Sequence, residues 1–325
     1  MEREKVIIVG GGPCGMSCAI ELQKKGIDPL IIEKENIVNT LYNFPTHQTF
    51  FSSSEKLEIG EIPFITEKQK PTRNQALAYY RSVADRKQLR IRSFEKVTQI
   101  RKEKGVFYLT TELSSNQSKQ YQADHVIIAT GYYDQPNRMG VPGEELAKVM
   151  HYFKEAHPYY NKEVVIIGGK NSAIDAALEL NKAGANITVL YRGDQYSKSI
   201  KPWILPDFDS LVRKDIIQME FNAHVEKITD HHVYYTVNGE QKKITNDFVF
   251  AMTGYRPNVK FLQEIGIRVD PTSGKAVFNE ETYETNIKDL FIAGVIAAGF
   301  NNNKIFIENG RFHGQQIAKA IVEPK

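Results

Sequence analysis

The sequence is poor in cysteine and tryptophan and has no long apolar stretch. Its 325 residues include two cysteines, Cys14 and Cys18, and one tryptophan. Two cysteines are too few for the disulfide framework of a small secreted protein. No apolar run approaches the roughly 18 residues of a membrane-spanning helix, and the first ten residues lead directly into a strand-like run rather than a secretory signal. We therefore expect a cytoplasmic protein with no membrane segment.

The charged residues and histidines show no pattern typical of a nucleic-acid, membrane or metal-binding site. Lysine and arginine exceed the acidic residues by a net charge of +3 and form no dense basic run. This excludes a strongly electrostatic nucleic-acid or membrane surface. The adjacent His231 and His232 are expected on opposite faces of a strand, so we predict no metal site there. The length suits about two domains.

The clearest positive feature is an internal repeat. Residues 6–34 begin VIIVGGGPCG and residues 164–192 begin VVIIGGKNSA, and the two segments align without a gap. Each has an apolar run, a glycine turn, a helical pattern and a second apolar run. This order predicts two β-α-β units with parallel strands.

The resemblance between the halves continues downstream and predicts the fold class. Two later strands end in Thr-Gly-Tyr, at 130–132 and 253–255, and each follows a stretch with strand-like alternation. We predict an α/β protein with two Rossmann-like three-layer domains, the second inserted in the first. The expected bounds are 1–140 with 256–325 for the first domain and 141–255 for the second.

The first glycine turn has the spacing of a dinucleotide-binding turn. Gly10 allows the tight turn, Gly12 lets the backbone approach a pyrophosphate, and Gly15 permits close packing of the helix on the strand. Glu33 lies 18 residues after Gly15, where a carboxylate accepts a hydrogen bond from a ribose 2′-hydroxyl. The turn therefore predicts a dinucleotide, which we expect to be FAD.

The second turn departs from that pattern in a way that favours NADPH. Lys170 replaces the middle glycine, and Tyr191 followed by Arg192 stands where the first copy has Glu33. A carboxylate repels a 2′-phosphate, whereas an arginine holds one with a charge-assisted hydrogen bond of about 1.5–3 kcal/mol. Lys198 and Lys201 are candidate helpers.

These motifs resemble a known family. The two glycine turns, IIATG at 127–131 and DLFIAGVIAAG at 289–299 resemble the thioredoxin-reductase-like flavoproteins with two dinucleotide-binding domains. Within that group, GGGPCG, the stretch 39–60, GGKNSA and KPWILPDF look like the bacillithiol disulfide reductase family of the YpdA type. The resemblance implies FAD, NADPH and reduction of the disulfide of a low-molecular-weight thiol.

The repeat and the resemblance together give the candidate residues. In the first domain they are Gly10, Gly12, Pro13, Cys14, Gly15, Glu33, Lys34, Thr40, Val97, Thr130, Gly131, Gly294 and Val295. In the second domain they are Gly168, Gly169, Lys170, Asn171, Ser172, Ala173, Arg192, Lys198 and Gly254.

Three departures from the related reductases matter. The Cys-x-x-Cys of thioredoxin reductases is missing, and His151 and Lys154 fall about where its cysteines would be. The Cys-x4-Cys of the glutathione reductase type is missing as well. Val295 replaces the aspartate that usually holds the ribityl chain of the flavin, so that contact must come from elsewhere or from the main chain.

Cys14 is the candidate catalytic residue. It lies in the first helical turn, where the helix dipole favours a thiolate and a bound pyrophosphate opposes it. As a thiolate it would attack the disulfide substrate and form a mixed disulfide. The alternative is a small side chain that fills the turn, with the substrate reduced directly by the flavin. Cys18, one turn later, is expected in the core.

Other functions stay open at this stage. They are a ferredoxin or flavodoxin–NADP reductase, a flavin monooxygenase and a nucleotide-binding redox sensor without turnover. The family resemblance implies a homo-oligomer, either a dimer or a tetramer. We also expect a helix with a Thr72/Gln75 capping box, a C-terminal helix over 301–321, and proton supply from His47, His151 or His157 as an alternative to structural roles.

Overall fold

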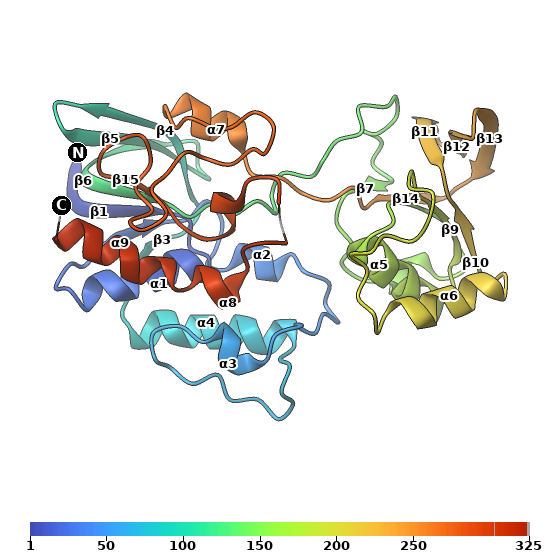
Figure 1. Cartoon of the computed structure of the whole chain (residues 1–325), viewed down its shortest axis with the longest axis horizontal. Helices are drawn as coiled ribbons and strands as arrows, with labels where there is room; N and C mark the ends of the chain where they lie inside the picture. The colour runs from blue at the N-terminus through green and yellow to red at the C-terminus, as the bar shows by residue number, and fades with distance from the viewer. Residues whose placement is uncertain (302, 324–325) are drawn as a thin grey trace. The chain divides into compact units, whose positions relative to one another are not determined.

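The computed structural model describes residues 1–301 and 303–323, which divide into two compact units (Figure 1). The first unit comprises Met1–Tyr42, Gln48–Gln135 and the chain from Tyr255 onward. The second comprises Asn43–His47 and Pro136–Gly254. The short segment from Asn43 joins the second unit because the Thr46 N–H donates to the Lys154 carbonyl at 2.9 Å.

A mainly parallel sheet forms the centre of the first unit. The strand order β3-β2-β1-β6 is parallel throughout, and β15 also pairs with β6 in parallel. The antiparallel strands β5 and β4 extend the sheet beyond β6. The bounds are β1 Glu2–Val9, β2 Leu30–Ile32, β3 Arg90–Arg92, β4 Glu95–Glu103, β5 Val106–Leu113, β6 Ser118–Ile128 and β15 Leu290–Ile292.

Helices cover this sheet, and two of them lie side by side. Helix α1 packs along α9, with Gly314 so close that a Cβ on it would lie 2.9 Å from the Cys18 Cα. Figure 1 shows this pair and, beside it, α4, which begins with the expected Thr72/Gln75 capping box. The bounds are α1 Pro13–Gln23, α2 Asn39–Tyr42, α3 Ser54–Leu57, α4 Arg73–Arg86, α7 Val259–Glu264, η2 Gly294–Ala298, α8 Ile307–Gly310 and α9 His313–Val322.

The second unit repeats this plan. A parallel sheet has the order β10-β9-β8-β14-β7, and an antiparallel sheet has the order β11-β12-β13. The bounds are β7 Val149–Met150, η1 His157–Tyr159, β8 Glu163–Ile167, α5 Asn171–Lys182, β9 Asn186–Leu190, α6 Leu205–Arg213, β10 Ile217–Glu220, β11 Ala223–Ile228, β12 His232–Val237, β13 Glu240–Thr245 and β14 Phe248–Ala251. The α/β class with a repeated Rossmann-like unit is confirmed.

The C-terminal helix differs from the prediction. The sequence predicts one helix over 301–321, but the structure has the short α8 followed by α9. The break follows Gly310, where the backbone passes so close to Cys14 that a Cβ would lie 2.9 Å from its Sγ. A residue with a side chain would not fit at position 310.

In the described part of the chain, no helix is both long and apolar enough to cross a membrane.

Candidate nucleotide and thiol site

The first glycine turn joins the carboxyl end of β1 to α1. A Cβ on Gly10, which has φ +113°, would lie 2.5 Å from the Ala129 carbonyl oxygen. A Cβ on Gly15 would lie 2.1 Å from the Gly10 carbonyl oxygen, so the helix rests on backbone there. At Gly12, the N-cap of α1, a Cβ would meet open space. The turn therefore presents free backbone at the helix N-terminus, which suits a phosphate.

Glu33 forms hydrogen bonds to the backbone of the first glycine turn and of the chain that follows β2. Its Oε2 accepts from the Gly11 N–H at 2.7 Å and its Oε1 accepts from the Glu35 N–H at 3.0 Å. Burial raises the pKa of this carboxyl, and the two backbone hydrogen bonds partly oppose the shift. Each carboxylate oxygen accepts more than one hydrogen bond, so a ribose hydroxyl fits beside the backbone donors. The neighbouring Lys34 pairs with Asp134 at 2.9 Å.

Thr130 provides a further test of whether a ligand fits this turn. Its Oγ1 is buried and has no hydrogen-bond partner among residues 1–301 and 303–323. The Thr130 Cα is 3.2 Å from where a Cβ on Gly10 would be, and a Cβ on Gly131 would lie 3.9 Å from the Val295 side chain. A buried hydroxyl without a partner costs free energy. A polar group of a bound nucleotide would supply the missing hydrogen-bond partner.

Cys14 is in the first turn of α1, enclosed by backbone. Cβ atoms built on Gly294 and Gly310 would lie 3.0 and 2.9 Å from its Sγ. Burial raises the pKa of the Cys14 thiol to about 12, although its residue surface is partly accessible. The thiol is therefore protonated at rest, because burial opposes the thiolate that the helix dipole favours. Cys18 is fully buried, as expected, and burial raises its pKa too.

Thr40 and Val97, two predicted cofactor contacts of the first unit, differ in how deeply they are buried. Thr40 is in α2, half-buried, and the loop before this helix is tied to the turn because the Val38 N–H donates to the Gly11 carbonyl at 3.0 Å. Val97 is buried in the core of the first sheet together with Tyr121 and Phe107.

His313 is a residue that the sequence analysis did not single out. At the start of α9, its Nδ1 accepts a hydrogen bond from the Gly294 N–H at 3.1 Å. Its ring stacks on Tyr283 with centroids 4.1 Å apart. Burial lowers its pKa from 6.5 to about 4, so the imidazole is neutral. The helical pattern around it contains no signal for this role.

The second glycine turn, between β8 and α5, is built differently. Gly168, with φ +144°, approaches the Met252 carbonyl as Gly10 approaches Ala129. The Tyr191 ring lies on the next residue, since a Cβ on Gly169 would be 2.3 Å from its Cγ. Lys170 is exposed at the N-cap of α5, and Ala173 is buried.

Asn171 clamps the loop that follows β9. Its Nδ2 donates to the Ser199 carbonyl at 2.9 Å, and its Oδ1 accepts from the Lys201 N–H at 3.0 Å. Lys201 also lies 3.8 Å from Asp175. Ser172, Arg192 and Lys198 are exposed in this region. The loop is thus held at the N-terminus of α5, where a nucleotide phosphate would bind.

The Thr-Gly pair of the second unit has its polar groups satisfied. Thr253 donates through Oγ1 to the Asn137 carbonyl at 2.6 Å, and Asn137 Nδ2 donates back to the Thr253 carbonyl at 3.1 Å. Asn137 N–H donates to the Gly254 carbonyl at 2.9 Å. Gly254 therefore anchors the chain entering this unit.

The three histidines considered as proton donors all lie in the second unit. His151 Nε2 lies 2.6 Å from Arg138 Nη1 and 3.6 Å from Glu144. Because the guanidinium can only donate, Nε2 accepts, and burial followed by the Arg138 charge lowers the pKa of His151. His47 and His157 line a shallow surface pocket of about 440 Å³ in the second unit.

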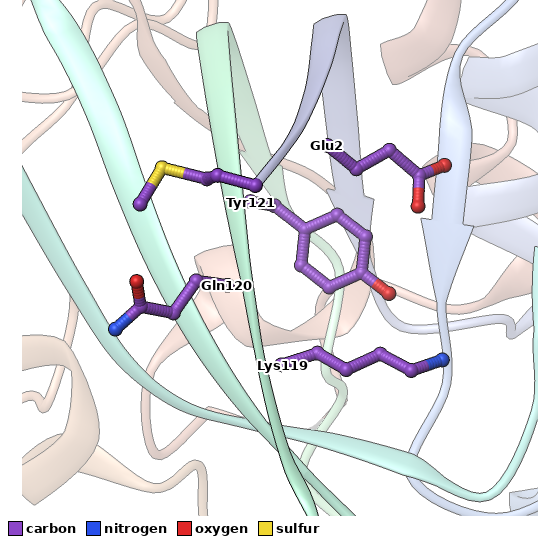
Figure 2. A pocket seen from close by; sticks show the side chains of 5 residues that line it. Glu2, Lys119, Gln120 and Tyr121 are labelled. Atoms are coloured by element: carbon purple, nitrogen blue, oxygen red, sulfur yellow. The ribbon is translucent and has the colours of Figure 1, made fainter.

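Another hollow lies at the far end of the first sheet. It has a volume of about 270 Å³ and is lined by Met1, Glu2, Lys119, Gln120 and Tyr121 (Figure 2). Glu2 is the first residue of β1, whereas the glycine turn follows Val9, its last. Seven residues of strand, at about 3.3 Å each, separate them by roughly 23 Å. This hollow is not part of the nucleotide site.

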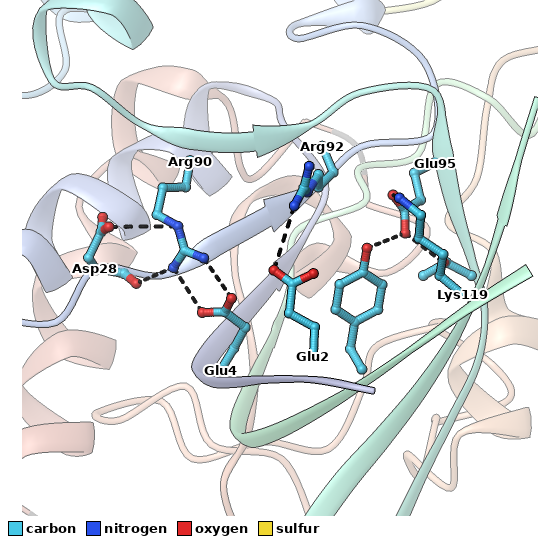
Figure 3. Close-up of polar contacts among 9 residues, drawn as sticks. Glu2, Glu4, Asp28, Arg90, Arg92, Glu95 and Lys119 are labelled. Atoms are coloured by element: carbon cyan, nitrogen blue, oxygen red, sulfur yellow. Dashed lines mark hydrogen bonds and ion pairs between the residues drawn. The ribbon is translucent and has the colours of Figure 1, made fainter.

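Charged groups fasten the edge strand β3 near that hollow. Arg90 forms two hydrogen bonds to Glu4, at 2.6 and 2.8 Å, and lies 3.8 Å from Asp28 (Figure 3). Since β3 pairs with β2 and the Arg92 carbonyl accepts from the Glu33 N–H at 2.8 Å, these contacts help to position Glu33. Their function is structural.

Comparison with known proteins agrees with this geometry. A family model described as pyridine nucleotide-disulphide oxidoreductase matches residues 7–294. The bacilliredoxin reductase Bdr of Bacillus subtilis (strain 168) is 60% identical, covering 99% of both chains. The chain belongs to the pyridine nucleotide-disulphide oxidoreductases, within the Bdr (YpdA) family.

Solved structures of this family have the same fold. The bacillithiol disulfide reductase Bdr (YpdA) from Bacillus cereus is 59% identical, with a TM-score of 0.98. The one from Staphylococcus aureus is 57% identical, with a TM-score of 0.95. Each comparison covers 100% of both chains. This Bdr-family protein is an oxidoreductase of the flavin-dependent disulfide reductase class, which uses a flavin and a pyridine nucleotide.

Proposed function

We propose that the protein binds FAD in the first unit and NADPH in the second, and reduces bacillithiol disulfide. The observation that carries the FAD assignment is the first glycine turn, which is open at Gly12 and lies beside the unpartnered Thr130 hydroxyl. The substrate follows the printed names of the Bacillus cereus and Staphylococcus aureus relatives.

In this proposal, the chain's own residues bind and orient. The bound flavin would supply the redox chemistry, passing the two electrons of one hydride to the disulfide, which takes up two protons and leaves as two thiols. Gly10, Gly12 and Gly15 let the backbone hold the pyrophosphate, and Glu33 accepts from the ribose. Arg192 and Lys198 hold the 2′-phosphate of NADPH. Asn171 fixes the chain directly after Lys198, at Ser199 and Lys201.

Cys14 is the proposed reacting thiol, but it must become accessible and lose its proton before it can react. Its pKa of about 12 and its enclosure by Gly294 and Gly310 require that it be uncovered and deprotonated before it attacks. Attack would release one thiol and leave the other joined to Cys14, to be freed by two electrons and a proton. A Cys14→Ala variant with full turnover would leave direct reduction as the mechanism.

The test begins with the purified protein. We expect a yellow protein that releases FAD on denaturation and consumes NADPH faster than NADH when given bacillithiol disulfide. Glutathione disulfide, oxidised thioredoxin and ferredoxin serve as parallel acceptors. Faster turnover with ferredoxin would support a ferredoxin–NADP reductase, stoichiometric oxygen consumption a monooxygenase, and no turnover a redox sensor. A colourless protein that takes up no flavin would overturn the proposal.

The name of the Bacillus subtilis relative supports a second substrate, the protein bacilliredoxin. Oxidised bacilliredoxin, offered without free bacillithiol, would be reduced in that case. Reduction only after bacillithiol is added would favour the small disulfide. We also propose a cytoplasmic homo-oligomer, a dimer or a tetramer. Thiol reduction suits a reducing compartment, and light scattering of the purified protein gives the oligomeric mass.

A further inference from the structure

His313 connects the start of α9 to the loop after β15. Its Nδ1 accepts the Gly294 N–H at 3.1 Å, across 19 residues of sequence. The side chain is buried, with 6% of the residue surface exposed. It is the acceptor that satisfies this buried N–H.

The segment that His313 holds meets two candidate flavin contacts, Cys14 and Gly131. Gly294, with φ +77°, lies against Cys14, since a Cβ there would be 2.9 Å from the Cys14 Cβ. The next residue, Val295, lies near Gly131. The same loop would provide the ribityl contact, but Val295 has no carboxylate to make it. The main chain of the loop must therefore be placed accurately.

We propose that His313 is a positioning residue for the flavin site, in that its Nδ1 fixes the main chain at Gly294 and Val295 against Cys14 and Gly131. The inference rests on the proposed binding of FAD by the first unit. In related reductases an aspartate contacts the ribityl chain of the flavin directly. Here His313 would act indirectly, by positioning the main chain that makes the contact.

The surroundings of His313 keep the ring in one orientation and uncharged. Tyr283 stacks on it at 4.1 Å with planes 22° apart, and Phe278 stacks on Tyr283 at 5.6 Å. A neutral imidazole has one nitrogen free to accept, and the Gly294 N–H determines that this is Nδ1. The tautomer that donates from Nε2 is thus selected.

The variants separate the hydrogen bond from the packing. In His313→Asn, the amide oxygen is bonded to Cγ as Nδ1 is, so it can accept from Gly294. In His313→Leu, no acceptor remains. In His313→Gln, the oxygen lies one bond further out. His125→Leu is the matched control, because His125 is a half-buried histidine of the same unit, in β6, near Asp289 rather than Gly294.

The readouts are flavin affinity and flavin potential, with the melting temperature of the flavin-free protein as a measure of packing. Apoprotein is titrated with FAD. We expect about tenfold weaker binding for His313→Leu, as for a buried donor left unpaired, and binding within about threefold of wild type for His313→Asn and His125→Leu. The Leu variant should also shift the flavin potential and visible spectrum.

Equal FAD affinity and potential in wild type, His313→Leu and His313→Gln would overturn the inference. If the Leu variant does not fold, weaker binding by Gln than by Asn supports it and equal binding by the two overturns it. Failure of the wild-type protein to bind FAD would instead overturn the proposed function, so the two outcomes are distinguishable.

Discussion

Acidification should weaken the first unit through His313, and the size of the effect follows from its pKa. Burial lowers that pKa from 6.5 to about 4. Tyr283, which stacks on the ring, has its pKa raised and stays neutral in this range. As the pH falls, the unfolded chain takes up a proton at this histidine before the folded chain does. The stability that His313 contributes is therefore complete above about pH 6.5 and is lost towards pH 4.

The loss is large enough to measure. A shift of 2.5 units corresponds to about 3 kcal/mol at 1.36 kcal/mol per unit. Between pH 7 and pH 5, where the folded imidazole is still neutral, the share lost is about 2 kcal/mol. This changes the equilibrium between folded and open forms about 20-fold. His313→Asn has no titrating group, so this part of the pH dependence should disappear.

Hydrogen exchange measured by mass spectrometry can locate the effect in one unit. Peptides from β1 and β15 report the first unit, and opening free energies at pH 7 and pH 5 are compared after correction for the intrinsic exchange rate. Trp203, the one tryptophan, belongs to the second unit. Its fluorescence during urea unfolding is an internal control that the variant should leave unchanged.

The comparison of the two proteins removes the contribution of other acids and histidines, because they are present in both. If wild type and His313→Asn lose the same opening free energy between pH 7 and pH 5, then His313 is not held neutral by burial and the reasoning fails.

Three further predictions test other contacts. Arg192→Ala should raise the KM for NADPH about 10- to 100-fold and leave the KM for NADH unchanged; equal effects on both would remove Arg192 from the phosphate site. Gly310→Ala places a methyl group 2.9 Å from the Cys14 Sγ and should cost about 1–3 kcal/mol of stability in a melting experiment, part of which Cys14→Ala restores; independent, additive effects would contradict this contact. Thr130→Val should weaken FAD binding about fivefold with little change in stability, whereas Thr253→Val should cost about 1 kcal/mol of stability; the reverse pattern would show that Thr130 has no ligand.

Most of the fold could be predicted because each of its signals is local. The alternation of apolar residues and glycines in 6–34 and 164–192 indicates parallel β-α-β units without any knowledge of distant contacts. Thr72 and Gln75 are three residues apart, and Asn238-Gly239, a common hairpin-turn pair, joins β12 to β13. Such patterns depend on backbone geometry that neighbouring residues determine.

Contacts between distant segments could not be predicted in the same way. The pattern around 301–321 predicts a single helix because Gly310 looks like a tolerated glycine, and its close contact with Cys14 of α1 cannot be inferred from that pattern. His313 lies on the apolar face of α9, where a core histidine is the ordinary expectation. Its acceptor role depends on Gly294, which reaches it through the topology of β15.

The protonation state of the Cys14 thiol also could not be predicted from the sequence. The position predicts a favourable helix dipole, equivalent to about half a charge. Burial acts in the opposite direction and is the larger effect, since the pKa rises to about 12. The glycines responsible, Gly294 and Gly310, are 280 or more residues away in the chain, so no local pattern could reveal the enclosure.

The two copies of the repeat differ in the hydrogen bonding of the same threonine. The same Thr-Gly pair ends β6 and β14, but Thr253 is bonded to Asn137 while Thr130 has no partner within the described residues. Asn137 belongs to the segment that enters the second unit, so in that copy the threonine secures the chain. In the first copy the corresponding hydroxyl is left for something outside the chain. A buried hydroxyl without a partner is retained at a cost, and a permanently held nucleotide would offset that cost, whereas a nucleotide that must leave after each turnover would not. The asymmetry therefore favours the resident cofactor in the first unit and the exchanging one in the second.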